Sequence, residues 1–148
     1  MFKKLLAAAA LGGLMMTSGC STTDLMKSAA DMFGNDALVS SLTSGLGLSA
    51  GQAAGGLGSM MSLAKNTLPT SDFLSLAGYL PNASEYLKFA QDAGVLSGPL
   101  TDVAGLNSTM DSLGISPATA QDMYKQVGQF IGDAGGSAER SMLMGLLK

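Results

Sequence analysis

The side chains that most often carry chemistry are scarce in this chain. It has one cysteine, Cys20, and no histidine. Without an imidazole, the sequence excludes histidine-based catalytic triads, histidine metal ligands and the usual proton shuttle near neutral pH. None of the serines lies in a Gly-x-Ser-x-Gly nucleophile elbow, so a hydrolase built on serine and acidic residues is the least favoured hypothesis. We expect no enzymatic activity, no metal site and no cofactor.

The acidic residues have a structural explanation. Asp72 and Glu85 fall in the first turns of expected helices, and Asp102 lies near another helix start. A negative charge at these positions interacts favourably with the helix dipole. No EF-hand spacing occurs. The acids are therefore assigned to helix ends instead of to acid–base catalysis.

Cys20 closes an N-terminal segment that has three parts. Lys3 and Lys4 give a basic start, residues 5–16 form an uncharged and mostly apolar run, and residues 17–19 are small. This order is typical of a secretory signal peptide. The run is shorter than the roughly 20 residues of a transmembrane helix. The pattern predicts that residues 1–19 are a signal peptide and that the protein is exported.

A cysteine directly after the small residues resembles the lipobox of bacterial lipoproteins, although Thr17 stands where leucine is usual. The resemblance implies cleavage between Gly19 and Cys20, a diacylglyceryl group on the Cys20 thiol, and a fatty acid such as palmitate on the new amine. Two or three acyl chains hold a protein durably on a membrane, whereas one holds it only marginally. Ser21 is not aspartate, and the sorting rule of Gram-negative lipoproteins then implies the outer membrane, inner leaflet, facing the periplasm.

The charge of the mature chain argues against nucleic acid as a partner. Without Lys3 and Lys4, the 8 basic residues become 6 against 11 acidic ones, a net charge of −5. The remaining cations are scattered singly, whereas nucleic-acid binding requires clustered Lys and Arg. Tryptophan is absent and aromatic residues make up 5% of the chain, which disfavours stacking platforms for bases or sugars.

The pattern after the leader is helical, and no segment alternates as a strand would. We expect an all-α fold, a compact bundle of about six or seven short helices over residues 36–148. Residues 20–35 are expected to be a lipidated tether, in which Leu25, Met26, Met32 and Phe33 could form a short amphipathic helix. The expected helices begin near Asp36, Ser49, Thr70, Asn82, Asp102, Ser116 and Ala138. Capping boxes are predicted for the pairs Ser49–Gln52 and Asn82–Glu85, and Pro117 suits a first helical position.

Two short stretches resemble each other. Residues 46–49 read Leu-Gly-Leu-Ser, and residues 113–116 read Leu-Gly-Ile-Ser. In both, a glycine would end one helix and a serine would cap the next. A duplicated binding unit is one interpretation. We favour the simpler one, in which these residues only end one helix and start the next, because the matched stretch is short.

No charged residue occurs between Ala37 and Ala64. That length could span a membrane. Serines interrupt the segment, turn signals lie at Gly45 to Ser49, and its second half is amphipathic. These features favour a helical hairpin in the core over a membrane span.

Glycines and methionines gather in the second half of this segment. Gly55, Gly56 and Gly58 each weaken a helix by about 1 kcal/mol relative to alanine, so we expect a neighbouring helix to pack closely there. Core filling is the default interpretation of Met60 and Met61, and of Met123 further along the chain. The alternative is a Gly- and Met-rich groove for a ligand, which would leave several of these side chains exposed together.

The stretch from about Leu38 to Leu147 resembles a family of uncharacterised proteobacterial proteins, the VcgC/VcgE type. The matching residues are Leu46 to Ser49, Gln52-Ala53, Gly55-Gly56, residues 63–65, Asp72-Phe73, Leu80-Pro81 and residues 113–117. The resemblance implies a compact helical domain and supplies no catalytic residues. We expect a non-enzymatic envelope lipoprotein whose domain binds an unknown protein partner or maintains the envelope. The alternative is a binding protein or sensor for an apolar ligand or lipid.

Overall fold

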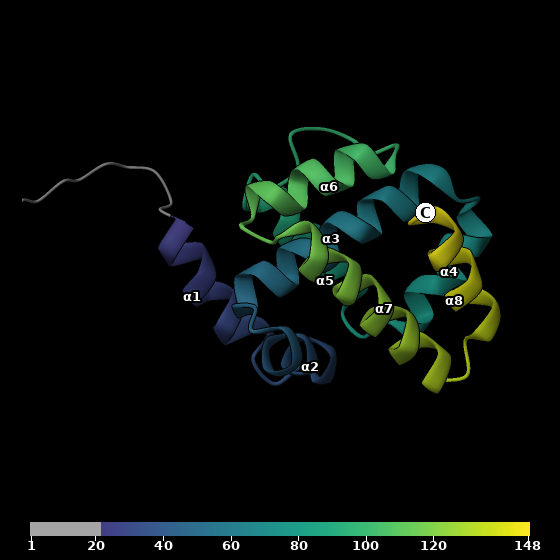
Figure 1. The fold of residues 1–148 in the computed structure, drawn as a ribbon, viewed down its shortest axis with the longest axis horizontal. Helices are drawn as coiled ribbons and strands as arrows, with labels where there is room; N and C mark the ends of the chain where they lie inside the picture. Colours follow the sequence, from purple (N-terminus) through teal and green to yellow (C-terminus); the bar gives the residue numbers. More distant parts are fainter. Residues whose placement is uncertain (1–21) are drawn as a thin grey trace, which may run out of the picture.

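The computed structural model describes residues 22–148, which form eight α-helices and no strand (Figure 1). The helices are α1 (Thr22–Phe33), α2 (Ala37–Leu46), α3 (Ala50–Thr67), α4 (Thr70–Tyr79), α5 (Ala83–Asp92), α6 (Val103–Ser112), α7 (Pro117–Asp133) and α8 (Ser137–Leu146). The expected all-α bundle is confirmed. No helix in this part of the chain has the length and apolar character needed to cross a bilayer.

Helix α3 is the centre of the bundle and contacts α1, α2, α4, α5, α6 and α8. Gly51 and every residue from Ala53 to Ala64 are buried. A helical segment can be buried on all sides when it carries no charge and its residues are small or apolar, as they are from Ala53 to Ala64. Helices α2 and α3 form the predicted core hairpin.

Two helix starts follow their predicted caps. The hydroxyl of Ser49 accepts the Gln52 N–H at 3.1 Å, and the Gln52 side chain accepts the Ser49 N–H at 3.0 Å, which completes the capping box. The hydroxyl of Ser116 accepts the Thr119 N–H at 3.3 Å, with Pro117 at the first helical position. These local signals placed α3 and α7 correctly.

The second predicted capping box, at Asn82, is wrong. A side-chain N-cap requires extended backbone, whereas Asn82 has a left-handed φ of 58° and makes no side-chain cap bond. Asparagine tolerates this conformation better than most residues. Its amide instead donates a hydrogen bond of 2.9 Å to Asp36 Oδ2, across the bundle.

Within the expected tether, residues 22–33 form α1, the short helix that the sequence allowed there, but this helix packs on the domain instead of standing apart from it. Ala29 and Phe33, one turn apart, are 0% and 2% exposed, and α1 packs on α3. The Phe33 ring lies 4.8 Å from the ring of Tyr86 and 5.8 Å from that of Phe89, measured between centroids. Aromatic burial of this kind is strongly favourable. The packed domain therefore includes the last turns of α1.

Helices α2–α3–α4 and α6–α7–α8 form two units of matched construction. Their helices contain 10, 18 and 10 residues in the first unit, and 10, 17 and 10 in the second. Gly47 and Gly114 turn the chain at left-handed φ values of 67° and 76°. Buried residues recur at one constant interval along the sequence: Ala53 and Ala120, Leu57 and Tyr124, Met60 and Val127, Leu76 and Leu143, Leu80 and Leu147.

The two units also pack on each other reciprocally. Helix α2 contacts α7, α3 contacts α6, and α4 contacts α8, as expected for two like units facing each other (Figure 1). The turns themselves meet, because the Gln52 side chain donates a 3.0 Å hydrogen bond to the Leu113 carbonyl. The similarity between residues 46–49 and residues 113–116 therefore reflects more than a helix end followed by a helix start. It marks a structural repeat.

Candidate functional site

Gly55, Gly56 and Gly58 of α3 face three different neighbours. A Cβ at Gly55 would lie 3.2 Å from the side chain of Leu113, and one at Gly56 would lie 2.7 Å from Cε of Met123. Both glycines are covered by side chains. The close backbone crossing lies instead at Gly58, where a Cβ would overlap the Tyr86 carbonyl oxygen. The structure thus separates three glycines that the sequence could only group.

The methionines singled out in the sequence are buried. Met60, Met61 and Met123 are 2%, 2% and 0% exposed, and all three belong to the main hydrophobic core. The thioether of Met123 covers Gly56, with Met110 beside it. Flexible methionines suit the irregular space beside glycine. A groove lined by these methionines would need them exposed together, and they are not.

Sequence reasoning missed a polar cluster between the start of α2 and the start of α5. The Asp36 carboxylate, on a residue 9% exposed, accepts the N–H groups of Leu38 at 2.9 Å and Val39 at 3.4 Å, and the Asn82 amide. The Tyr86 hydroxyl is buried and has no hydrogen-bond partner among the described residues. Burial, and then the nearby Asp36 carboxylate, raise the pKa of Tyr86 far above its usual value. The contacts of Asp36 with the Leu38 and Val39 N–H groups are local and predictable, whereas Asn82 and Tyr86 are distant from it in the sequence.

A second buried tyrosine links α7 to α6 within the second unit. The Tyr124 hydroxyl, on α7, donates a 3.1 Å hydrogen bond to Asn107 Oδ1, on α6. Burial raises the pKa of Tyr124 to about 12. Both tyrosines are therefore neutral at physiological pH, and their rings fill space in the core.

An open hollow of about 580 Å³ lies between α4 and α5. Apolar side chains form most of its walls: Phe73, Leu74, Ala77, Leu80, Ala83 and Leu87. Leu74 is 62% exposed and, with Met32, is one of two large apolar side chains exposed to solvent within residues 27–148. We call this hollow the α4–α5 groove. Leu74 was not singled out from the sequence because it belongs to an ordinary helical pattern.

A smaller hollow of about 290 Å³ adjoins this groove. Lys65 and Leu87 line both hollows. Lys65 is exposed and forms no ion pair within residues 27–148, whereas Lys88 pairs with Asp92 and Lys125 with Asp122. The lining of the groove therefore carries one charge of each sign, on Lys65 and Glu85, and the two side chains form no ion pair with each other.

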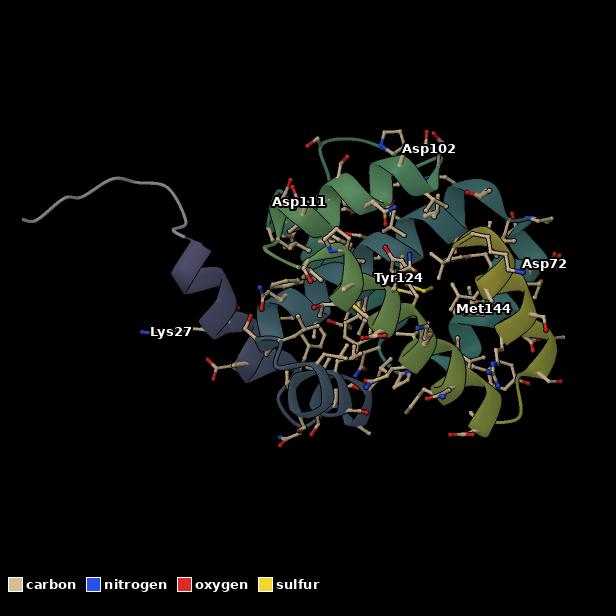
Figure 2. The ribbon with its side chains drawn as sticks, viewed as in Figure 1. Lys27, Asp72, Asp102, Asp111, Tyr124 and Met144 are labelled. Atoms are coloured by element: carbon tan, nitrogen blue, oxygen red, sulfur yellow. The ribbon has the colours of Figure 1, made fainter. Side chains whose placement is uncertain are left out.

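The labelled acids Asp72, Asp102 and Asp111 lie well apart on the surface (Figure 2). Across the described residues, no three acidic, histidine or cysteine side chains gather into a group that could hold a metal ion. Asp102 has the structural role expected of it, because its carboxylate accepts the Gly105 N–H at 2.7 Å and caps α6.

The predicted cleavage and lipidation residues, Gly19 and Cys20, lie outside the described residues. What the structure shows is the segment that follows. Helix α1 begins at Thr22, and the exposed Lys27 on it points away from the bundle (Figure 2). Any group attached to Cys20 would thus be close in sequence to a helix that packs on the core.

The fold and these surfaces define an all-α protein that consists of two like three-helix units, the first of which contains the buried helix α3, with α1 and α5 packed on α3. A family profile described as "Protein of unknown function VcgC/VcgE (DUF2780)" matches residues 16–148. The chain belongs to this family. Comparison with curated proteins and with solved structures gives no match.

Proposed function

We propose that this protein is an envelope lipoprotein without enzymatic activity, which presents its helical domain to another protein or helps to maintain the envelope. Cys20 would carry the lipid. The support from sequence is the order of Lys3 and Lys4, the apolar run and the small residues before this cysteine. We place the protein on the inner leaflet of the outer membrane, facing the periplasm, because Ser21 follows the cysteine.

The structural observation that carries the proposal is the position of α1. Its first residue, Thr22, follows Cys20 after one intervening residue, and its buried residues Ala29 and Phe33 fix its far end to the core. The lipidated cysteine would therefore be joined to the domain by a short helix, in which the chain rises about 1.5 Å per residue, instead of by a flexible linker. A lipid on Cys20 would hold the domain close to the bilayer.

The interior of the domain favours protein interaction over the alternative, a carrier or sensor of an apolar ligand. The residues proposed to line a ligand groove, Gly55, Gly56, Met60, Met61 and Met123, are buried in the core and packed against neighbouring helices. A small-molecule site usually encloses most of its ligand. The α4–α5 groove, with exposed Leu74 and Lys65, is open instead.

Cell fractionation of a Cys20→Ser variant tests the proposal. We expect the wild type in the outer-membrane fraction and Cys20→Ser in the soluble periplasmic fraction, because the acyl chains supply the membrane affinity. Ser21→Asp is the matched control: it keeps the lipid and should move the protein to the inner membrane. Unchanged membrane partition of Cys20→Ser would refute lipid anchoring.

A further inference from the structure

The smaller hollow beside the α4–α5 groove contains a buried hydroxyl without a partner. Ser62 of α3 lines this hollow and is only 5% exposed. Its hydroxyl forms no hydrogen bond within residues 27–148, whereas the hydroxyl of Ser59, about one turn earlier, donates to the Gly55 carbonyl at 2.7 Å. A buried polar group without a partner is costly, and most such groups in proteins are paired. Ser62 therefore offers a free hydroxyl to a molecule that enters the hollow.

The lining of the smaller hollow carries one charge, and that charge is positive. Lys65 lies about one turn after Ser62 and on the same face of α3, because residues three apart on a helix are neighbours. Within residues 27–148, no acidic side chain lines the hollow. Glu85 lines the α4–α5 groove and not this hollow, and Asp92 pairs with Lys88. An ammonium group and a hydroxyl without an opposing carboxylate favour an anionic ligand, to which both can donate hydrogen bonds.

The remaining walls of the smaller hollow are mostly apolar and are held in place. Leu87 of α5, together with Leu96 and Pro99 of the loop that follows it, provides hydrocarbon contacts. The Asn66 amide donates a 3.1 Å hydrogen bond to the Leu100 carbonyl, which ties this loop to α3. The volume of about 290 Å³ is close to the lower limit of small-molecule sites, about 300 Å³. The hollow thus suits a molecule with one anionic group and a short hydrocarbon part.

The surroundings of the cation favour a carboxylate over a phosphate. Phosphate sites often use arginine side chains or several backbone N–H groups at a helix N-terminus. Ser62 and Lys65 lie in the second half of α3, where the N–H groups belong to the hydrogen bonds of the helix itself. The same fact argues against acyl transfer, although the spacing Ser-x-x-Lys occurs in serine acyl enzymes, because these N–H groups are not free to form an oxyanion hole.

We propose that the smaller hollow binds a small monocarboxylate with a short hydrocarbon chain. The carboxylate accepts hydrogen bonds from the Ser62 hydroxyl and the Lys65 ammonium group, and the hydrocarbon chain lies against the apolar walls. The affinity is modest, because Lys65 lies in the last turn of α3, where the helix dipole is negative. This inference goes beyond the proposed function and does not depend on a lipid at Cys20, so the two proposals can fail separately.

Titration with sodium isocaproate, followed by NMR, tests this proposal. The full-length Cys20→Ser protein is used, and its amide signals are recorded as the ligand is added. We expect saturable shifts in residues 62–66, 87–91 and 96–99, with a dissociation constant of about 1 mM. Isocaproamide, which has the same shape without the charge, and inorganic phosphate should bind about tenfold more weakly. No saturable shift up to about 10 mM isocaproate, or equal binding of the amide or of phosphate, would overturn the proposal.

Two pairs of variants make the test specific. Ser62→Ala should weaken isocaproate binding about fivefold, because one hydrogen bond is lost, and its midpoint of unfolding in urea should not fall, since the hydroxyl has no partner in the protein. Ser59→Ala, the matched control, removes a hydroxyl that does not line the hollow and should leave binding unchanged. Lys65→Gln should weaken binding about tenfold, whereas Lys125→Gln, which changes the net charge equally on α7, should not. Wild-type affinity in Ser62→Ala or in Lys65→Gln would contradict the assignment of the site.

Discussion

Gly58 of α3 lies directly against the backbone of Tyr86 in α5. A Cβ at Gly58 would overlap the Tyr86 carbonyl oxygen and lie 2.6 Å from Cβ of Ala90. Because the obstacle includes backbone, a side-chain rotation cannot relieve it. This contact sets how closely the two most extensively packed helices of the bundle approach.

Gly58→Ala should therefore destabilise the domain in spite of the better helix propensity of alanine. Overpacking of a core costs about 1–3 kcal/mol, and we expect the free energy of unfolding to fall by at least that much. Gly78→Ala is the control, since a Cβ at Gly78 meets nothing within 4 Å. It should gain up to about 1 kcal/mol. Urea unfolding of both variants in the Cys20→Ser background measures this, and a Gly58→Ala variant as stable as the parent would disprove the close crossing.

Phe33 tests whether α1 is part of the packed domain. Its ring is buried against Tyr86 and Phe89, whereas Met32, its neighbour, is 53% exposed. Phe33→Ala should cost about 3 kcal/mol or more, and Met32→Ala should change stability by less than about 0.5 kcal/mol. Hydrogen exchange of the α1 amides, together with the unfolding free energy, measures the effect. If α1 amides exchange equally fast in the parent and in Phe33→Ala, α1 is a tether after all.

Asp36 should matter more than an ordinary helix cap. Asp36 accepts two N–H groups at the start of α2 and also the Asn82 amide, whereas Asp102 caps α6 at an exposed position. Loss of a cap costs about 1 kcal/mol. We expect Asp102→Ala to cost that amount and Asp36→Ala to cost about 0.5–1.5 kcal/mol more, because the hydrogen bond from the Asn82 amide is lost as well. Thermal unfolding of the two variants compares them, and equal losses would show that the contact between Asp36 and Asn82 contributes nothing.

The buried tyrosines predict loss of stability in alkali. Tyr124 has a pKa of about 12 in the folded protein, above its ordinary value of 10.0. Above pH 10 the unfolded chain releases this proton while the folded protein retains it, so the stabilisation present below pH 10 is lost progressively as the pH rises toward 12.

Absorbance titration and unfolding at several pH values test this expectation. Tyr124→Phe should show a shallower loss of unfolding free energy between pH 10 and 12 than the wild type. It should also retain the same native phenolate absorbance below pH 11, because Tyr124 is still protonated there. A Tyr124→Phe variant whose stability declines as steeply as that of the wild type would contradict the role of this burial.

Local sequence signals predicted the elements whose determinants are local. The caps at Ser49 and Ser116, the break at Pro69 and the stop at Gly47 placed helices α2, α3, α4 and α7. Asn82 failed because its side chain forms a hydrogen bond with Asp36, and no local pattern indicates a partner 46 residues away. The packing of α1 on the domain was not predicted, because Phe33 is buried against Tyr86 and Phe89, which are also far from it in the sequence.

Tertiary packing also decided the candidate sites. Three glycines in α3 indicated close packing, but the sequence could not show that Gly58 alone meets backbone. The structural repeat was hidden because the two units share buried positions more than residue types, as in Leu57 and Tyr124. The α4–α5 groove was not predicted because the exposure of Leu74 depends on how α4 packs against α3, α5 and α8.

The intact mass of the protein purified from membranes tests the central claim, a lipid on Cys20, most directly. We predict a chain that begins at Cys20 and carries the added mass of a diacylglyceryl group and one further fatty acyl chain. A chain that retains residues 1–19, or one that begins at Cys20 without acyl mass, would contradict this account.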